Sequence, residues 1–165
     1  PIFFADNVLS PQLGGGFALF YDFAETLPAG LGTVITADGD GLQNVYSYLA
    51  TAYPDSRFAL SSYLEDQTIR FFFGFGQPDQ TITGEEYAAG LVDVRDRLPS
   101  QWGTYFAAGG DHTFIGVPTR YNGSSGGVTL SSYVGQLVSG NVSDVAPTPV
   151  RPALASAPRS LVLVR

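Results

Sequence analysis

Two ionisable residues follow short apolar segments, where an enzyme could use them. Asp66 comes after the segment 57–62, and His112, the only histidine in the chain, comes after the segment 102–108. An imidazole can accept the proton of a nucleophile, while a carboxylate at its other nitrogen fixes the tautomer and stabilises the imidazolium that forms. We therefore expect Asp66 and His112 to work together as the acid and base of a nucleophilic site.

Each residue also has a non-catalytic interpretation. A lone histidine in a glycine-rich loop is often a surface or hydrogen-bonding residue, and an aspartate after a strand commonly caps the next helix. Glu65 and Asp111 are competing acids for the imidazole. Because neighbours in sequence point in different directions from a turn, we prefer Asp66 to both.

Three helices are predicted from apolar residues at helical spacing. The first has Asp40 as its N-cap and stops at Pro54; the second begins with the capping box of Thr83 and Glu86 and stops at Pro99. The third spans residues 129–139. The expected buried faces are Leu42, Val45, Leu49 and Tyr53 in the first helix, Tyr87, Leu91, Val94 and Leu98 in the second, and Leu130, Val134 and Leu137 in the third.

The segments 57–62 and 102–108 are the strands expected between these helices. Helices that alternate with strands indicate an α/β fold, with a mostly parallel sheet and crossover helices. In such sheets, reactive groups gather just past the carboxyl ends of the strands. Both Asp66 and His112 follow a strand in this way, so two neighbouring loops can bring them within hydrogen-bond distance.

The composition excludes several classes of function. The net charge of −7 argues against a nucleic-acid partner, and no apolar run is long enough to span a membrane. With no cysteine and one histidine, neither thiolate ligands nor a two-histidine zinc site can form. The segment Asp38–Gly41 is no EF-hand, because its twelfth position is Leu49 instead of glutamate. No cofactor is expected.

A change of composition divides the chain into two parts. We expect residues 1–145 to form the α/β domain and residues 146–165 to form an extended tail rich in proline and alanine. The end of that tail, Leu161–Val164, could add an edge strand.

Several short motifs resemble the bacterial pectin acetylesterase-like branch of the α/β-hydrolases. They are Tyr53-Pro54, Arg57–Ser62, Asp66, Ile69, Gly109–Thr113, Leu130 and Tyr133. In that fold the triad follows the order Ser, Asp, His. The resemblance implies a serine carboxylesterase with Asp66 and His112 as two triad members. It also implies O-acetylated pectic polysaccharide or a small ester as substrate, although related members remove fatty acyl groups from proteins.

The nucleophile departs from this pattern. Ser10 lacks the glycines of a nucleophile elbow, and the one G-x-S-x-G match, Gly123–Gly127, falls after His112 and reads as a flexible polar loop. By resemblance, Ile2–Asp6 is the strand that follows the nucleophile region. We therefore expect the C-terminal part of a hydrolase, with the serine supplied by an upstream segment or a partner chain, and stability only beside that second polypeptide.

Two aromatic features complete the prediction. The run Phe71–Gly76 either lines an acyl or sugar pocket or belongs to the core, and Trp102 is expected to be structural. The alternative to the esterase is a non-catalytic structural or binding protein on a hydrolase-like scaffold. Either would suit a secreted, cell-surface or periplasmic location.

Overall fold

A small parallel sheet forms the centre of the computed structural model, which describes residues 43–73, 82–114 and 117–147. Its strands are β1 (Phe58–Tyr63), β2 (Trp102–Ala107) and β5 (Asp144–Val145), in the order β1-β2-β5. Both outer strands run parallel to β2. The predicted α/β class and the two predicted strands are therefore confirmed, while β5 was not predicted.

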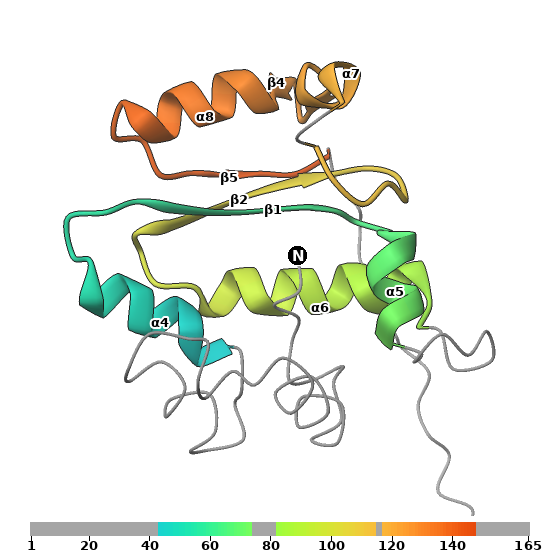
Figure 1. Ribbon diagram of the computed structural model, residues 1–165, viewed down its shortest axis with the longest axis horizontal. Helices are drawn as coiled ribbons and strands as arrows, with labels where there is room; N and C mark the ends of the chain where they lie inside the picture. Colours follow the sequence, from blue (N-terminus) through green and yellow to red (C-terminus); the bar gives the residue numbers. More distant parts are fainter. Residues whose placement is uncertain (1–42, 74–81, 115–116, 148–165) are drawn as a thin grey trace, which may run out of the picture.

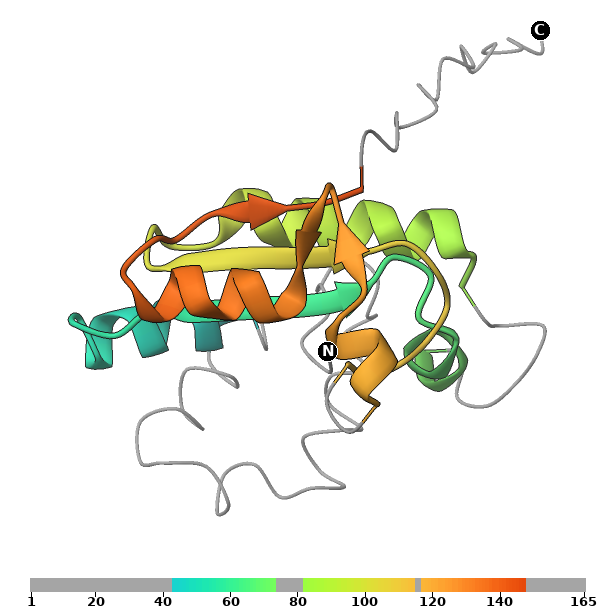
Figure 2. The same cartoon turned by 90° about the horizontal axis from the view of Figure 1, so that it is seen from above.

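Helices cover both faces of this sheet. The helices are α4 (Gln43–Ala52), α5 (Gln67–Phe73), α6 (Gly84–Arg97), α7 (Pro118–Tyr121) and α8 (Leu130–Val138). Figure 1 shows α4 and α6 along one face and α8 along the other. The view from above in Figure 2 shows α8 running alongside the strands, just after a short antiparallel hairpin of β3 (Ser124–Ser125) and β4 (Val128–Thr129).

The core is split into two clusters because successive strand residues face opposite sides of the sheet. Phe106 points toward the α4 and α6 side, and its neighbour Tyr105 points toward α8. The first cluster consists of Tyr46, Leu60, Leu64, Ile69, Tyr87, Leu91, Val94 and Phe106. The second consists of Tyr63, Tyr105, Ala107, Phe114, Leu130, Tyr133 and Val145.

The crossover helix α6 is bounded by local signals. The hydroxyl of Thr83 accepts a hydrogen bond from the backbone N–H of Glu86 at 3.1 Å, and the Glu86 carboxylate accepts one from the backbone N–H of Thr83 at 2.8 Å. This is the predicted capping box. The helix ends at Arg97, just before Leu98 and Pro99. Tyr87, Leu91 and Val94 of its predicted buried face are buried, whereas Leu98 follows the helix as its C-cap and is only partly buried.

Two predicted faces need correction. Tyr53 is 53% exposed because α4 ends at Ala52, one residue earlier, so its side chain leaves the helical face. In α8, Val134 is 36% exposed, whereas Tyr133 is fully buried beside Leu130. The buried stripe there follows the i, i+3 spacing, which turns the next position toward solvent.

Several predictions concern residues outside the described ranges. They are Ile2–Asp6, Ser10, the segment Asp38–Gly41 with the N-cap Asp40, Leu42, and residues 148–165 of the tail with Leu161–Val164. Within the described residues, no helix has the length and apolar character needed to cross a membrane.

Candidate active site

The ends of β1 and β2 bring the two predicted site loops to one edge of the sheet. The strands pair in parallel from Phe58 with Trp102 to Tyr63 with Ala107, so they end at the same level. The loops that begin there carry Asp66 and His112. This is the edge at which open parallel sheets place their reactive groups.

Backbone hydrogen bonds then hold the two loops together. The N–H of Leu64 donates to the carbonyl of Ala107 at 2.8 Å, and that of Glu65 donates to Gly109 at 3.0 Å. A third bond, also of 3.0 Å, joins the N–H of Gln67 to the carbonyl of Gly110. The loops are therefore positioned by their backbones as well as by side chains.

Two glycines follow β2 in the second loop, and the first of them needs to be glycine. Gly109 has a φ of +110°, a region that side-chain-bearing residues rarely adopt. A Cβ on Gly110 would lie 2.9 Å from the side-chain nitrogen of Gln67. Gly109 is therefore needed for its backbone conformation, whereas a side chain at Gly110 would require the end of the Gln67 side chain to shift.

Asp66 and His112 form a direct hydrogen bond across this edge. The Oδ2 atom of Asp66 lies 2.9 Å from the Nδ1 atom of His112. The Oδ1 atom of Asp66 accepts a second bond, of 2.9 Å, from the backbone N–H of Ile69 in α5. Asp66 therefore caps a helix and holds the imidazole at once, so the two interpretations of this residue are compatible.

The burial of the pair is asymmetric. Asp66 is fully buried, while the side chain of His112 is 35% exposed. When Asp66 is ionised it can only accept hydrogen bonds, so in the neutral imidazole Nδ1 of His112 donates to it and Nε2 carries the lone pair. Among the described residues, no group forms a hydrogen bond with Nε2, which remains able to accept a proton.

A buried pair of hydroxyls, on Ser62 and Tyr87, lies close enough to Asp66 to feel its charge. Tyr87 Oη and Ser62 Oγ are 3.1 Å apart, and Ser62 Oγ donates to the carbonyl of Tyr63 at 3.0 Å. Burial raises the pKa of the Tyr87 phenol, and the nearby charge of Asp66 adds to this shift, so Tyr87 stays neutral. Because Ser62 is buried and donates to a backbone carbonyl, it does not act as a nucleophile.

The two competing acids are engaged elsewhere. The side chain of Glu65 packs against Gly84 at the start of α6, where a Cβ would lie 2.9 Å from Glu65 Cγ. Asp111 Oδ1 is paired with Arg120 Nη2 at 2.6 Å. The structure therefore brings His112 to Asp66, as expected, and the catalytic role of the pair remains a prediction.

The G-x-S-x-G match adopts a hairpin instead of the predicted flexible loop. Gly126 and Gly127 have φ values of +54° and +79°, and they form the turn between β3 and β4. Ser125 is buried and its Oγ donates to the carbonyl of Phe106 at 2.6 Å. A nucleophile elbow joins a strand to a helix. This strand–turn–strand arrangement with a buried hydroxyl excludes Ser125 from that role.

Sequence reasoning missed two residues that support the histidine loop. Phe114 is buried, and its ring stacks on that of Tyr63, with centroids 4.3 Å apart and planes inclined by 15°. Arg120, in α7, contacts Asp111, which lies on the same loop as His112. The role of Phe114 could have been predicted from its apolar side chain two positions after His112, whereas no local pattern pointed to Arg120.

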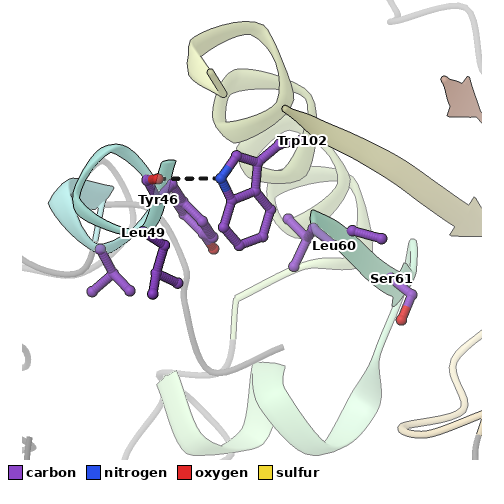
Figure 3. Close-up of a pocket in the computed structure, with 7 residues that line it drawn as sticks. Tyr46, Leu49, Leu60, Ser61 and Trp102 are labelled. Carbon is purple, nitrogen blue, oxygen red and sulfur yellow. Dashed lines mark hydrogen bonds between the residues drawn. The ribbon is translucent and has the colours of Figure 1, made fainter. Parts of the chain in front are cut away.

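An apolar pocket of about 230 Å³ lies between α4, β1 and the start of β2 (Figure 3). Neither Asp66 nor His112 lines it. Its lining residues are Val45, Tyr46, Leu49, Ala59, Leu60, Ser61 and Trp102. Trp102 Nε1 donates to the carbonyl of Tyr46 at 3.1 Å, and the indole stacks on Phe58. Trp102 thus holds α4 against the sheet, which agrees with its expected structural role.

The aromatic run after Asp66 is described only in part. Phe71 lies in α5 and is 47% exposed, so it is not a core residue. The side chains of Phe72 and Phe73 and all of residues 74–76 lie outside the described part. The choice between pocket and core therefore stays a prediction for the rest of the run.

The described ranges contain no cluster of three or more His, Cys, Asp or Glu side chains that could hold a metal ion. Comparison with family models, curated proteins and solved structures gave no match to this chain. The resemblance to pectin acetylesterase-like proteins accordingly remains a prediction from the motifs.

Proposed function

We propose that this chain provides the acid and base of a serine carboxylesterase, as the C-terminal part of an α/β-hydrolase. Asp66 orients His112, and His112 acts as general base for a serine carried by an upstream segment or a partner chain. The observation that carries this proposal is the 2.9 Å contact between a fully buried carboxylate and a partly exposed imidazole. Nε2 of His112 has no hydrogen-bond partner among the described residues, which leaves it available to a serine hydroxyl.

The reaction follows from the tautomer that Asp66 imposes. His112 Nε2 accepts the proton of the serine hydroxyl as its oxygen attacks the acyl carbonyl, and then returns this proton to the departing alcohol. Water completes the cycle: Nε2 takes its proton while the hydroxide oxygen attacks the acyl-enzyme, and the serine leaves with that proton. The buried charge of Asp66 stabilises the imidazolium in both halves, because a low-dielectric surrounding strengthens their attraction.

The substrate class comes from the motif resemblance. It favours short O-acyl groups, acetyl above all, on polysaccharide or a small ester, and a secreted or cell-surface protein. The parallel sheet and the two strand-end loops support this proposal, because α/β-hydrolases present their acid and histidine on such loops.

The test is hydrolysis of p-nitrophenyl acetate by the native protein together with whatever chain accompanies it. We expect His112→Ala to remove most of the activity, and Asp66→Asn to lower kcat by about 10⁴-fold, as in related triads. Asp96→Asn is the matched control, because Asp96 is exposed and pairs only with the neighbouring Arg95 among the described residues.

After labelling with a fluorophosphonate, intact-mass analysis would show which chain carries the label, and peptide mapping would locate the serine. The proposal predicts a labelled serine outside the described residues, on an accompanying chain or segment, and labelling that depends on His112. Equal hydrolysis by the wild type and His112→Ala, or none by either between about pH 6 and 9, would favour the non-catalytic structural protein.

A further inference from the structure

Arg120 makes two contacts with the loop that carries His112. Its Nη2 atom lies 2.6 Å from Asp111 Oδ1, and its Nη1 atom donates to the carbonyl of Thr113 at 3.3 Å. Asp111 and Thr113 are the residues immediately before and after His112. The Arg120 guanidinium therefore binds the residues on both sides of His112 in sequence, Asp111 and Thr113.

The backbone that carries Arg120 is itself held against the sheet. Pro118 occupies the first turn of α7, and the next residue after Arg120, Tyr121, packs against the α8-side core cluster. The hydroxyl of Tyr105 in β2 lies 2.9 Å from the carbonyl of Val128 and 3.2 Å from that of Gly123, two residues after α7, and these two carbonyls share its proton. Arg120 thus reaches the histidine loop from a backbone fixed to β2.

The ion pair also removes a competitor of Asp66. Asp111 precedes His112 in sequence, and a free carboxylate there could attract the imidazole away from Asp66. Pairing with Arg120 satisfies this carboxylate and turns it toward α7. A guanidinium suits this task better than an ammonium, because its planar fork can bond to a carboxylate and a carbonyl at once.

We propose that Arg120 is a positioning residue that holds His112 in the orientation and tautomer set by Asp66. Both Arg120 and Asp111 are partly exposed, with side chains 32% and 51% accessible, so the pair contributes little to global stability. Its effect is local, on the direction of the imidazole. The consequence for catalysis rests on the proposed function, whereas the effect on the imidazole does not.

The single histidine makes this proposal directly testable on the full chain. Long-range ¹H–¹⁵N correlation spectra give the tautomer of His112 without assignment ambiguity, at a pH where titration shows the ring to be neutral. We expect the wild type to hold the Nδ1–H tautomer. Arg120→Gln should shift the population toward the Nε2–H tautomer, and Arg120→Lys should restore part of the wild-type spectrum.

Matched variants separate this role from a general loss of structure. Arg95→Gln removes a partly exposed arginine that also pairs with an aspartate, and it should leave the His112 signals unchanged. Asp111→Asn removes the ion pair together with the competing carboxylate and keeps the bond to Thr113, so it should retain the wild-type tautomer. If Arg120→Gln does not fold, Arg120→Lys decides, and a fully wild-type tautomer in folded Arg120→Gln, or in Arg120→Lys in its place, would overturn the proposal.

Activity provides a second measurement. In the active assembly, Arg120→Gln should lower kcat by about 10- to 100-fold with KM unchanged, because the base is misplaced while substrate contacts remain. Unchanged kcat with a shifted tautomer would overturn the catalytic part of the proposal. A wild type with no esterase activity would refute the proposed function, while the spectra would still decide the role of Arg120.

Discussion

Two substitutions of Asp66 should separate its helix-capping role from its role at His112. Asp66→Ala removes both the bond from the Ile69 N–H and the bond to His112 Nδ1. Asp66→Asn keeps a side-chain oxygen for the cap, because asparagine caps helices about as well as aspartate. With that oxygen at the cap, the side-chain NH₂ group of the Asp66→Asn variant faces Nδ1 of His112. This group can only donate a hydrogen bond, so the imidazole must change to the Nε2–H tautomer.

The expected costs follow from these contacts. Loss of the helix cap costs about 1 kcal/mol. Loss of the charge-assisted bond to His112 adds about 1.5 kcal/mol, the lower end of its range, because the imidazole is 35% exposed. Asp66→Ala should therefore lower the free energy of unfolding by about 2–3 kcal/mol, and Asp66→Asn by about 1 kcal/mol.

Equilibrium urea unfolding at neutral pH, followed by circular dichroism, measures these differences. The m-value should stay the same if only stability changes. Asp96→Asn serves as the exposed control and should remain within about 0.5 kcal/mol of the wild type. Equal losses in Asp66→Asn and Asp66→Ala would refute the division of roles, as would an Asp66→Ala variant as stable as the control.

Two further predictions concern local structure. The hydrogen bonds from Thr83 lower the pKa of Glu86 in the folded protein. The ionised Glu86 side chain therefore stabilises the fold above the ordinary glutamate pKa of about 4.3, and this stabilisation is lost as pH falls through the lower folded-state pKa. Glu86→Gln should flatten this acid-side decline in urea midpoints, and an unchanged decline would contradict the capping box. Gly127→Ala should cost about 1 kcal/mol for its positive φ, because no atom lies within 4 Å of the added Cβ. Gly126→Ala should cost more, because its Cβ would lie 2.6 Å from the Ala146 carbonyl oxygen, and equal thermal midpoints for the two variants would refute that difference.

Local sequence signals determined much of the scaffold. The capping box of Thr83 and Glu86 and the stop at Pro99 bound α6, because these signals act within one helical turn. The strands on either side of α6 could be read from their apolar runs, and their alternation with helices was sufficient to indicate a parallel sheet. The order of Asp66 and His112 along the chain then predicted that both would lie at one edge.

Features that depend on distant residues could be decided only by the tertiary structure. Whether Asp66 reaches His112 depends on the register of β1 with β2 and on the backbone bonds between their loops, which join residues more than 40 positions apart. The burial of Ser125 depends on the Phe106 carbonyl, and the contact of Arg120 with Asp111 depends on how α7 packs beside β2. Sequence patterns report periodicity and caps within a few residues, whereas these contacts arise from the packing of separate elements, which no local pattern encodes.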